Sequence, residues 1–261
     1  MLKKRLIPAL FIKDGLIVRS ENFQKFKVIG NVVNEVRRYN QWDIDELLYI
    51  DISRGNYFDS GRSDHKVERV TSMAEVLSLV SRECFMPVTF GGRLDSFDSI
   101  AEFLRNGADK VIVNTLAFTN PEAVREASRV FGKQAIVFSC DYRMIDNSIV
   151  FFSHQGTVEQ ARDFTAILDV ISHIECGEVL LHDIGRDGEA NGYNLEAIST
   201  LAPLLDVPVV VCGGAGDKMD FDDVAGIPEV SGIAAGNWFH FTEQSYPRAK
   251  TYLKRKGHVF R

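Results

Sequence analysis

Short apolar runs alternate along the chain with segments of helical spacing. An apolar run without polar interruptions is typical of a strand that is buried on both faces, as in a parallel sheet. Eight such runs occur, and a helical or loop segment follows each of them. The predicted strands are Leu6–Ile12, Glu46–Ile52, Pro87–Phe90, Lys110–Val113, Ala135–Cys140, Glu178–His182, Val207–Cys212 and Gly232–Ala235.

The helical segments carry start and stop signals. Ser96 is a candidate N-cap with Gly107 beyond the helix end, and Pro121 stands near a first turn. The polar stretch Arg19–Asn31 is predicted as a long loop, and Ile149–His154 as an extra hairpin strand. The predicted helices are Val32–Trp42, Met73–Arg82, Ser96–Asn106, Pro121–Phe131, Val158–Ile174, Leu195–Leu204, Phe221–Ala225 and Tyr246–Lys256.

Strict alternation of eight strands with helices predicts a (β/α)8 barrel, with a doubly wound sheet as the alternative. The halves of the chain also match, which a doubly wound sheet does not explain. No linker separates them, so we expect one domain over residues 1–261 with an internal half-barrel duplication. The matching segments are Asp51–Arg54 with Asp183–Arg186, Phe90–Gly92 with Cys212–Gly214, and Asn114 with Asn237.

Composition narrows the class of protein. The 261 residues are 45% hydrophobic and 25% charged, as is ordinary for a soluble globular protein. The net charge of −6 argues against general nucleic-acid binding. No apolar run approaches the roughly 18 residues of a membrane span, and the run after the basic Met1–Arg5 is too short for a signal peptide. We therefore expect a cytoplasmic protein. Its four cysteines are widely spaced and form no CxxC pair, so neither a metal site nor a cofactor is predicted.

Polar and glycine residues gather where the predicted strands end, which in such a barrel is the face that carries chemistry. Glycine loops let backbone N–H groups approach an anion closely. Two phosphate sites are predicted, which together suit an elongated bisphosphate; the alternative is that these glycines only form turns. The first site comprises Gly91, Gly92, Asn114 and Thr115, and the second comprises Asp187, Gly188, Gly213, Gly214, Gly236 and Asn237.

Several motifs together give the chain a specific resemblance over nearly its whole length. They are Met1–Pro8, Asp43–Ile52, Asn106–Val111, Asp183–Gly188 with Asn191–Tyr193, Gly213–Gly216 and Phe239–Phe241. The chain resembles the cyclase subunit of imidazole glycerol phosphate synthase. The resemblance implies a (β/α)8 barrel that pairs with a glutaminase, takes ammonia through the barrel axis and uses it at the C-terminal face.

The resemblance also implies two acid–base aspartates, at the ends of strands 1 and 5. The strand 5 residue is Asp141, but the strand 1 position holds Phe11, and Asp14 belongs to the following turn. His182 replaces a small hydroxyl residue and is a candidate acid or base; the alternative is that it only hydrogen-bonds a neighbouring carboxylate. Two further departures stand beside the phosphate loops, Arg93 in place of glycine and Asn237 in place of serine.

At the opposite end of the barrel, the resemblance implies an ammonia gate of four charged residues. The matching positions are Arg5, Glu46, Lys110 and Glu178. Charges that point into a barrel axis must be paired, because an unpaired buried ion is costly. The alternative is four solvated charges at strand starts. Asp109 matches a residue that docks the glutaminase.

The gate is retained and the cyclisation end is altered, which favours a paralogue of the cyclase subunit. Such a protein would pass ammonia from a glutaminase to an amidation or amidination reaction, and we expect this in surface-polysaccharide sugar synthesis with a separate sugar amidotransferase. One alternative is a genuine cyclase–lyase of histidine biosynthesis, in which Asp141 works with His182 or Asp14. Another is a non-catalytic barrel that binds a phosphorylated metabolite and activates its glutaminase.

Overall fold

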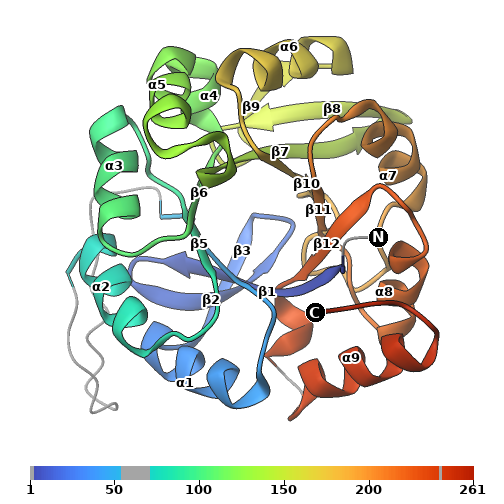
Figure 1. Cartoon of the computed structure of the whole chain (residues 1–261). Coiled ribbons are helices and arrows are strands. Elements are labelled where there is room, and N and C mark those ends of the chain that lie inside the picture. Colours follow the sequence, from blue (N-terminus) through green and yellow to red (C-terminus); the bar gives the residue numbers. More distant parts are fainter. Residues whose placement is uncertain (1–2, 54–70, 241–242) are drawn as a thin grey trace.

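The computed structural model describes residues 3–53, 71–240 and 243–261; Met1, Leu2, Arg54 and Phe241 of the motifs above lie outside these ranges. Eight parallel strands pair in a closed circle, and helices surround them (Figure 1). The predicted (β/α)8 barrel is therefore confirmed. In order around the barrel its strands are β1 (Arg5–Lys13), β4 (Leu47–Asp51), β5 (Val88–Gly91), β6 (Lys110–Val113), β7 (Ile136–Ile145), β10 (Glu178–Asp183), β11 (Val209–Cys212) and β12 (Val230–Ala235).

The outer helices begin where the sequence supplies caps. Ser96 accepts a hydrogen bond from the Ser99 N–H in a capping box, and Pro121 occupies the first turn of its helix. The helices are α1 (Val32–Trp42), α2 (Met73–Glu83), α3 (Phe97–Arg105), α4 (Thr115–Thr119), α5 (Pro121–Phe131), α6 (Phe164–Ile174), α7 (Leu195–Leu201), α8 (Lys218–Ala225) and α9 (Ser245–Arg255). Single 3-10 turns are η1 (Lys133–Ala135), η2 (Ala202–Leu204) and η3 (Asn237–Phe239).

The prediction of one long helix over Val158–Ile174 is wrong in its first part. Val158–Ala161 forms strand β9, and the helix begins only at Phe164. Asp163 explains the boundary, because its carboxylate accepts a hydrogen bond from the Thr165 N–H as an N-cap. The prediction missed this internal stop signal.

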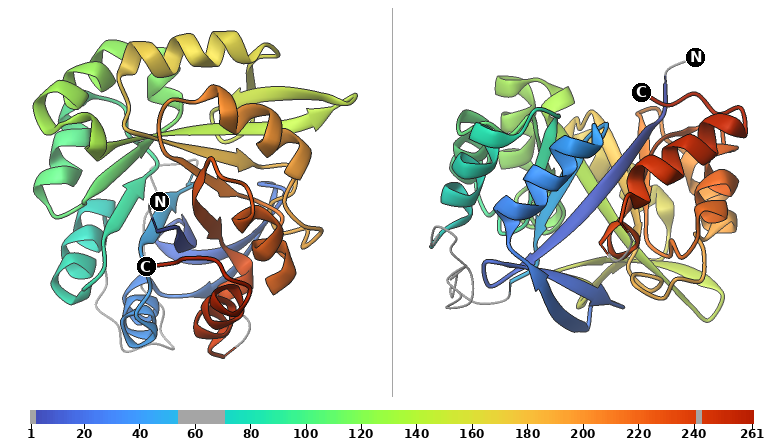
Figure 2. Two further views of the ribbon diagram at one scale, coloured as in Figure 1. Left: turned by 45° about the vertical axis from the view of Figure 1, so that its right-hand side comes forward. Right: turned by 90° about the horizontal axis from the view of Figure 1, so that it is seen from below.

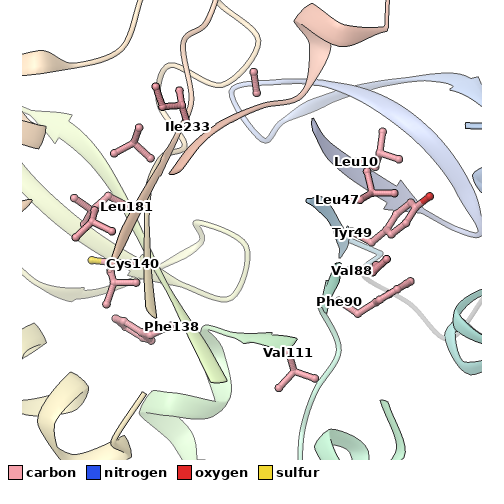
Figure 3. Packing of buried hydrophobic residues seen from close by; sticks show 14 of the residues in the cluster. Leu10, Leu47, Tyr49, Val88, Phe90, Val111, Phe138, Cys140, Leu181 and Ile233 are labelled. Carbon is pink, nitrogen blue, oxygen red and sulfur yellow. The ribbon is translucent and has the colours of Figure 1, made fainter. Parts of the chain in front are cut away.

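Alternate residues of each barrel strand face opposite sides, as the twofold repeat of a strand requires. Outward-facing side chains such as Leu10, Leu181 and Ile233 pack between strands and helices, outside the ring of strands in Figure 3. Each such buried aliphatic side chain is worth about 1.5–3 kcal/mol. Inward-facing side chains form a second, apolar cluster that fills the axis: Ile7, Ala9, Leu48, Ile112, Val137, Leu180, Val210, Cys212 and Ala234.

Two antiparallel extensions lengthen the first strand of each half. The prediction of a long loop over Arg19–Asn31 is wrong, because β2 (Leu16–Glu21) and β3 (Lys25–Gly30) form a hairpin on β1. The predicted strand near Ile149–His154 is confirmed as β8 (Ser148–Ser153), which pairs with β7 and β9. Both extensions lie at the end of the barrel away from the two termini (Figure 2, right).

Matching two-residue turns begin the two extensions. Asp14-Gly15 connects β1 to β2, and Asp146-Asn147 connects β7 to β8. All four residues have positive φ, between 49° and 90°. Turns of this mirror-image kind suit the twist of hairpin strands and favour Gly, Asn and Asp. The Asp-Gly pair was therefore the signal for a hairpin that the loop prediction overlooked.

The structure corrects the register of the internal repeat by one residue. Gly91 pairs with Ile50 and Cys212 pairs with His182, so Gly92 corresponds to Gly213. Both glycines have positive φ, and an added Cβ would overlap the carbonyl of Asp51 in the first half and of Asp183 in the second. By the same register, Arg93 corresponds to Gly214.

The pairing of Asn114 with Asn237 is also one residue off. Asn114 caps α4 and Gly236 caps η3, so Thr115 corresponds to Asn237. The duplication is thus present at both glycine loops, but in a register that the residue types alone did not reveal.

The overlap at Gly213 gives a stability prediction. We expect Gly213→Ala to lower the free energy of unfolding by about 1–3 kcal/mol, because the alanine needs both a strained φ and displacement of the Asp183 backbone. Gly226→Ala is the matched control, since Gly226 has a helical φ of −71° and its added Cβ would be 3.4 Å from the nearest atom. Urea unfolding measures both. Equal stability of the two variants would contradict the register argument.

Candidate functional site

Two pockets lie at the C-terminal ends of the strands, one in each half of the barrel. The first-half pocket has a volume of about 650 Å³, and the second-half pocket about 250 Å³. The first-half pocket is lined by Phe23, Ile50, Asp51, Ile52, Ser53, Gly92, Arg93, Leu94, Asp95, Ile112, Asn114, Thr115, Ser139, Asp141, His154, Gln155, Thr157 and His182. The second-half pocket is lined by Arg19, Asp187, Gly188, Ala190, Cys212, Gly213, Gly214, Ala215, Gly216, Ala235, Gly236, Asn237 and Trp238.

The predicted first phosphate site is assembled in part. Gly92, Asn114 and Thr115 line the first-half pocket. Gly91 is not among the residues that line it, and an added Cβ there would overlap Ile112. The Asn114 side-chain amide donates to the carbonyls of Ser139 (2.9 Å) and Phe152 (3.1 Å), so it holds β7 and β8 together. Of the predicted first phosphate site, the backbone at Gly92 is therefore the part that is suited to binding an anion.

All residues of the predicted second phosphate site line the second-half pocket, and several of them also hold the β2–β3 hairpin. The Asn237 amide donates to the Ser20 carbonyl (2.8 Å), and the Asn22 N–H donates to the Asp187 carbonyl (2.7 Å). An added Cβ at Gly188 would also overlap the Ser20 carbonyl. The hairpin is thus fastened over this pocket and forms one of its walls.

The two candidate acid–base residues lie side by side as register partners on the neighbouring strands β7 and β10. His182 Nδ1 is 3.6 Å from Asp141 Oδ1, and that carboxylate oxygen accepts a 2.6 Å hydrogen bond from the Ser139 hydroxyl. His182 is 1% exposed, and its Nε2 has no hydrogen-bond partner within the described part of the chain. Burial opposes the imidazolium, but the neighbouring Cys212 and Asp141 side chains raise the pKa of His182 above its ordinary value.

Three other carboxylates at the mouth are buried, and burial raises the pKa of each. Asp51 ends β4, receives the Ser53 N–H at 2.8 Å, and lies 3.9 Å from the Arg93 guanidinium. Asp183 is its counterpart in the second half and accepts two backbone N–H bonds. Burial raises the pKa of Asp187 to about 6. The mouth therefore presents carboxyl groups that hold a proton more readily than exposed ones do.

At the end of β1, Phe11 takes part in a cluster of three buried rings. It stacks on His182 with a centroid distance of 5.9 Å and an interplanar angle of 7°. Phe23, from the β2–β3 hairpin, packs edge-on against both, at 5.3 Å from Phe11 and 5.1 Å from His182. The strand 1 position thus contributes packing instead of a proton-transfer group.

Sequence reasoning missed several residues that line the first-half pocket, among them Phe23, Ser139, His154, Gln155 and Thr157. Ser139 lies two positions before Asp141, so the twofold strand repeat was the signal that placed it on the same face. Phe23 was hidden in the segment that was predicted as a loop. His154, Gln155 and Thr157 follow β8, and only the fold brings them over the mouth.

At the N-terminal end of the barrel, four side chains form a closed ring of alternating charge. Arg5 donates to Glu46 (2.6 Å) and to Glu178, and Lys110 donates to Glu46 (3.0 Å) and Glu178 (2.7 Å). Thr89 adds a 3.0 Å hydrogen bond to Glu46. Burial raises the pKa of Glu46, but the charges of Lys110 and Arg5 outweigh it and lower the pKa overall. The structure thus brings together the four residues predicted as a gate.

Directly inside this ring lies a small cavity on the barrel axis, about 10 Å³ in volume. Apolar side chains and the gate carboxylates line it, with Ile112 shared with the first-half pocket. A cavity of this size holds about one water-sized molecule. Asp109 lies at the same end of the barrel, exposed, and its carboxylate accepts a 2.8 Å hydrogen bond from the Val88 N–H.

Within the described ranges, no cluster of three or more His, Cys, Asp or Glu side chains is arranged to hold a metal ion. In the same part of the chain, none of the helices is long and apolar enough to cross a membrane.

The fold and site define a duplicated (β/α)8 barrel with glycine-loop pockets at one end and a closed charge ring at the other. A family model described as "Histidine biosynthesis protein" matches residues 5–245, and the chain belongs to this family. It is similar to the "Imidazole glycerol phosphate synthase subunit HisF" of Natranaerobius thermophilus, at 34% identity over 98% of both chains. The subunits of the same name from a Thermotoga species (34% identity, 98% of this chain and 97% of the relative) and Prosthecochloris aestuarii (32%, 100% of both) are also similar. The chain is thus a HisF-like barrel subunit.

The charge ring predicts a specific acid sensitivity. The pKa of Glu46 is lowered in the folded chain, so its ionisation stabilises the fold above the ordinary carboxyl pKa of about 4.3 and this contribution is lost as the pH falls. We expect Glu46→Gln to lower the free energy of unfolding by about 3 kcal/mol at pH 7, because the basic residues lose a buried partner. The deficit should shrink between about pH 5 and pH 3.

Urea unfolding at a series of pH values tests this expectation. Glu126→Gln is the control, because Glu126 is exposed on α5 and its loss should change stability by less than about 0.5 kcal/mol. A Glu46→Gln deficit that stays constant from pH 7 to pH 3 would show that its ionisation does not stabilise the ring.

Proposed function

We propose that this chain is the barrel subunit of a glutamine-dependent amidotransferase that takes ammonia from a partner glutaminase. The ammonia passes the ring of Arg5, Glu46, Lys110 and Glu178, crosses the apolar axis and reacts at the C-terminal mouth. The reaction there is an amidation or amidination other than imidazole formation. The observation that carries this proposal is the contrast between the two ends of the barrel.

At the N-terminal end, the ring is complete, and Arg5, Glu46 and Glu178 are buried while Lys110 is partly exposed. Its acidic and basic groups satisfy one another, so no charge is left unpaired when the ring is closed. The cavity beyond the ring is small, and aliphatic side chains line it together with Thr89 and the carboxylates of Glu46 and Glu178. Arg5 and Lys110 already neutralise these carboxylates, so the cavity suits a small neutral molecule better than a further ion. These features support passage of ammonia instead of ammonium.

At the C-terminal end, the acid–base pair of the cyclase is incomplete. Asp141 is in place, but Phe11 has no ionisable group and its ring is 2% exposed. A general acid or base typically contributes about 10²–10⁴-fold to a rate. We therefore place the chain in surface-sugar synthesis, where a separate sugar amidotransferase meets the barrel at this mouth and performs the reaction. A neighbouring gene cluster for polysaccharide synthesis would support this placement, and a histidine cluster would oppose it.

The cyclase reaction provides a direct test. We expect the purified chain, given the cyclase substrate and a high concentration of ammonium, to turn over at least about 10²-fold more slowly than a HisF subunit. Phe11→Asp, which restores the carboxylate, should raise the rate by about tenfold or more. Wild-type turnover equal to that of a HisF subunit would overturn the proposed reaction class.

A second candidate is the cyclase–lyase reaction itself, with His182 replacing the missing group. The observation that favours it is the position of His182 beside Asp141 in the first-half pocket. If this second candidate is correct, the wild-type chain has cyclase activity. His182→Asn should then abolish that activity, and Phe11→Asp should leave it about unchanged.

The partner surface gives a further prediction. We expect Asp109→Asn to weaken binding of a HisH-type glutaminase by about tenfold, the loss of about 1.4 kcal/mol, because the amide keeps the hydrogen bond to the Val88 N–H but lacks the charge. Asp169→Asn, exposed on the outer helix α6, is the matched control and should bind like the wild type. Surface plasmon resonance measures both. Equal affinities of the two variants would remove Asp109 from the docking surface.

A further inference from the structure

The three-ring cluster of Phe11, Phe23 and His182 lies between the two pockets of the mouth. Around the barrel, β11 and β12 separate β10 from β1. His182 is the next-to-last residue of β10 and Phe11 lies on β1, so their stacked rings reach across the two strands in between. The C-terminal ends of those strands, at Cys212–Gly213 and Ala235–Gly236, form the second-half pocket.

The rings also contact the backbone that builds the second-half pocket. An added Cβ at Gly236 would be 3.3 Å from the Phe11 ring, so this ring lies directly against the glycine loop. His182 is the register partner of Cys212 on β11. Phe23 closes the cluster from the hairpin side and lines the first-half pocket. All three rings are buried, which leaves little space between them.

The axis of the barrel opens on one side of this cluster. Ile50 and Ser139 stand two residues after Leu48 and Val137 of the axial cavity, and they form the next inward layer. Both belong to the first-half pocket, and Ile112 lines the axial cavity as well as that pocket. The second-half pocket shares no lining residue with the axial cavity.

We propose that Phe11, Phe23 and His182 form a wall that divides the mouth into two separate anion sites and directs a molecule leaving the axis into the first-half pocket. The first-half pocket then holds the ammonia acceptor, a compact hydroxyl-bearing ligand with a single phosphate-sized group. The backbone at Gly92 faces its anion. Asp51 and Asp141 face its hydroxyl groups. A ligand that bridges both glycine loops, as an elongated bisphosphate would, is excluded. Only the identification of the acceptor rests on the proposed function.

The pocket volumes support this choice of ligand. About 650 Å³ lies within the usual range for a small-molecule site of roughly 300–1,000 Å³. The second-half pocket, at about 250 Å³, is below that range and suits a lone phosphate group. The stacked contact of the His182 ring with the Phe11 ring adds attraction that keeps the wall closed.

Calorimetric titration with α,ω-alkanediol bisphosphates of increasing length, and with the matching monophosphates, tests the wall. For the wild type we expect two ligands per barrel and no gain of a bisphosphate over its monophosphate at any length. In Phe11→Ala the wall is open, and we expect a bisphosphate of matching length to bind once per barrel, about 10²-fold more tightly than the monophosphate. Phe26→Ala, from the same hairpin but outside the ring cluster, should behave as the wild type.

Circular dichroism establishes that each variant is folded, and Phe11→Leu, which removes the ring but keeps an apolar side chain, replaces Phe11→Ala if the latter unfolds. A wild-type barrel that already binds one bisphosphate tightly overturns the wall. Failure of both ligands to bind either protein overturns the anion sites and the proposal with them. These titrations use neither glutaminase nor ammonia. A titration result that overturns the wall would therefore not affect the proposed ammonia route. A negative ammonia assay would likewise not affect the binding result.

Discussion

The stack of Phe11 on His182 determines what the C-terminal mouth can do. Both side chains come from inward-facing positions at strand ends, where a polar group would face the pocket. Under the proposed function, an aromatic ring occupies the position of an acid–base residue and the mouth lacks a proton-transfer group; in the proposed wall, the same ring divides the mouth. The β2–β3 hairpin contributes to the same cluster, since its Phe23 packs edge-on against the other two rings.

The opposite end of the barrel obeys a different constraint. Four charged side chains meet there, three of them buried and Lys110 partly exposed, and the buried charges are tolerable because each contacts two oppositely charged neighbours. Between the two ends, the inward layers are aliphatic. A small neutral molecule can be accommodated in such an interior, whereas an ion cannot without its partners. The proposed function rests on this order of layers: a charged ring, an apolar axis and a divided polar mouth.

Sequence reasoning predicted the barrel because its signals are local and repeated. Eight apolar runs, the caps at Ser96 and Pro121, and the strand-end polar residues all follow from short-range rules. It failed where two signals competed. The polar residues of Arg19–Asn31 outweighed the Asp14-Gly15 turn, and the hairpin was missed. The sequence comparison aligned the glycine pairs of the two halves by residue type. The strand register instead makes Gly92 the equivalent of Gly213 in the internal repeat.

The sequence predicted many residues of the candidate site, but it predicted only part of how they are arranged in space. The structure brings the four charged residues of the ring into contact and places Asp141 beside His182. All six residues were chosen from the sequence. The roles of Asn114 and Asn237 as ties for neighbouring segments depend on contacts far apart in the chain, which no local pattern encodes. The ring cluster required three segments to meet, and one of them was taken for a loop.

The most direct test of the central claim is a crystal structure of the chain grown in phosphate. Two separate anions are predicted, one at Gly92 and one at Gly213 and Gly214, with the rings of Phe11 and His182 stacked between them. Rings that lie apart, with one continuous cleft joining the two anions, would contradict the account.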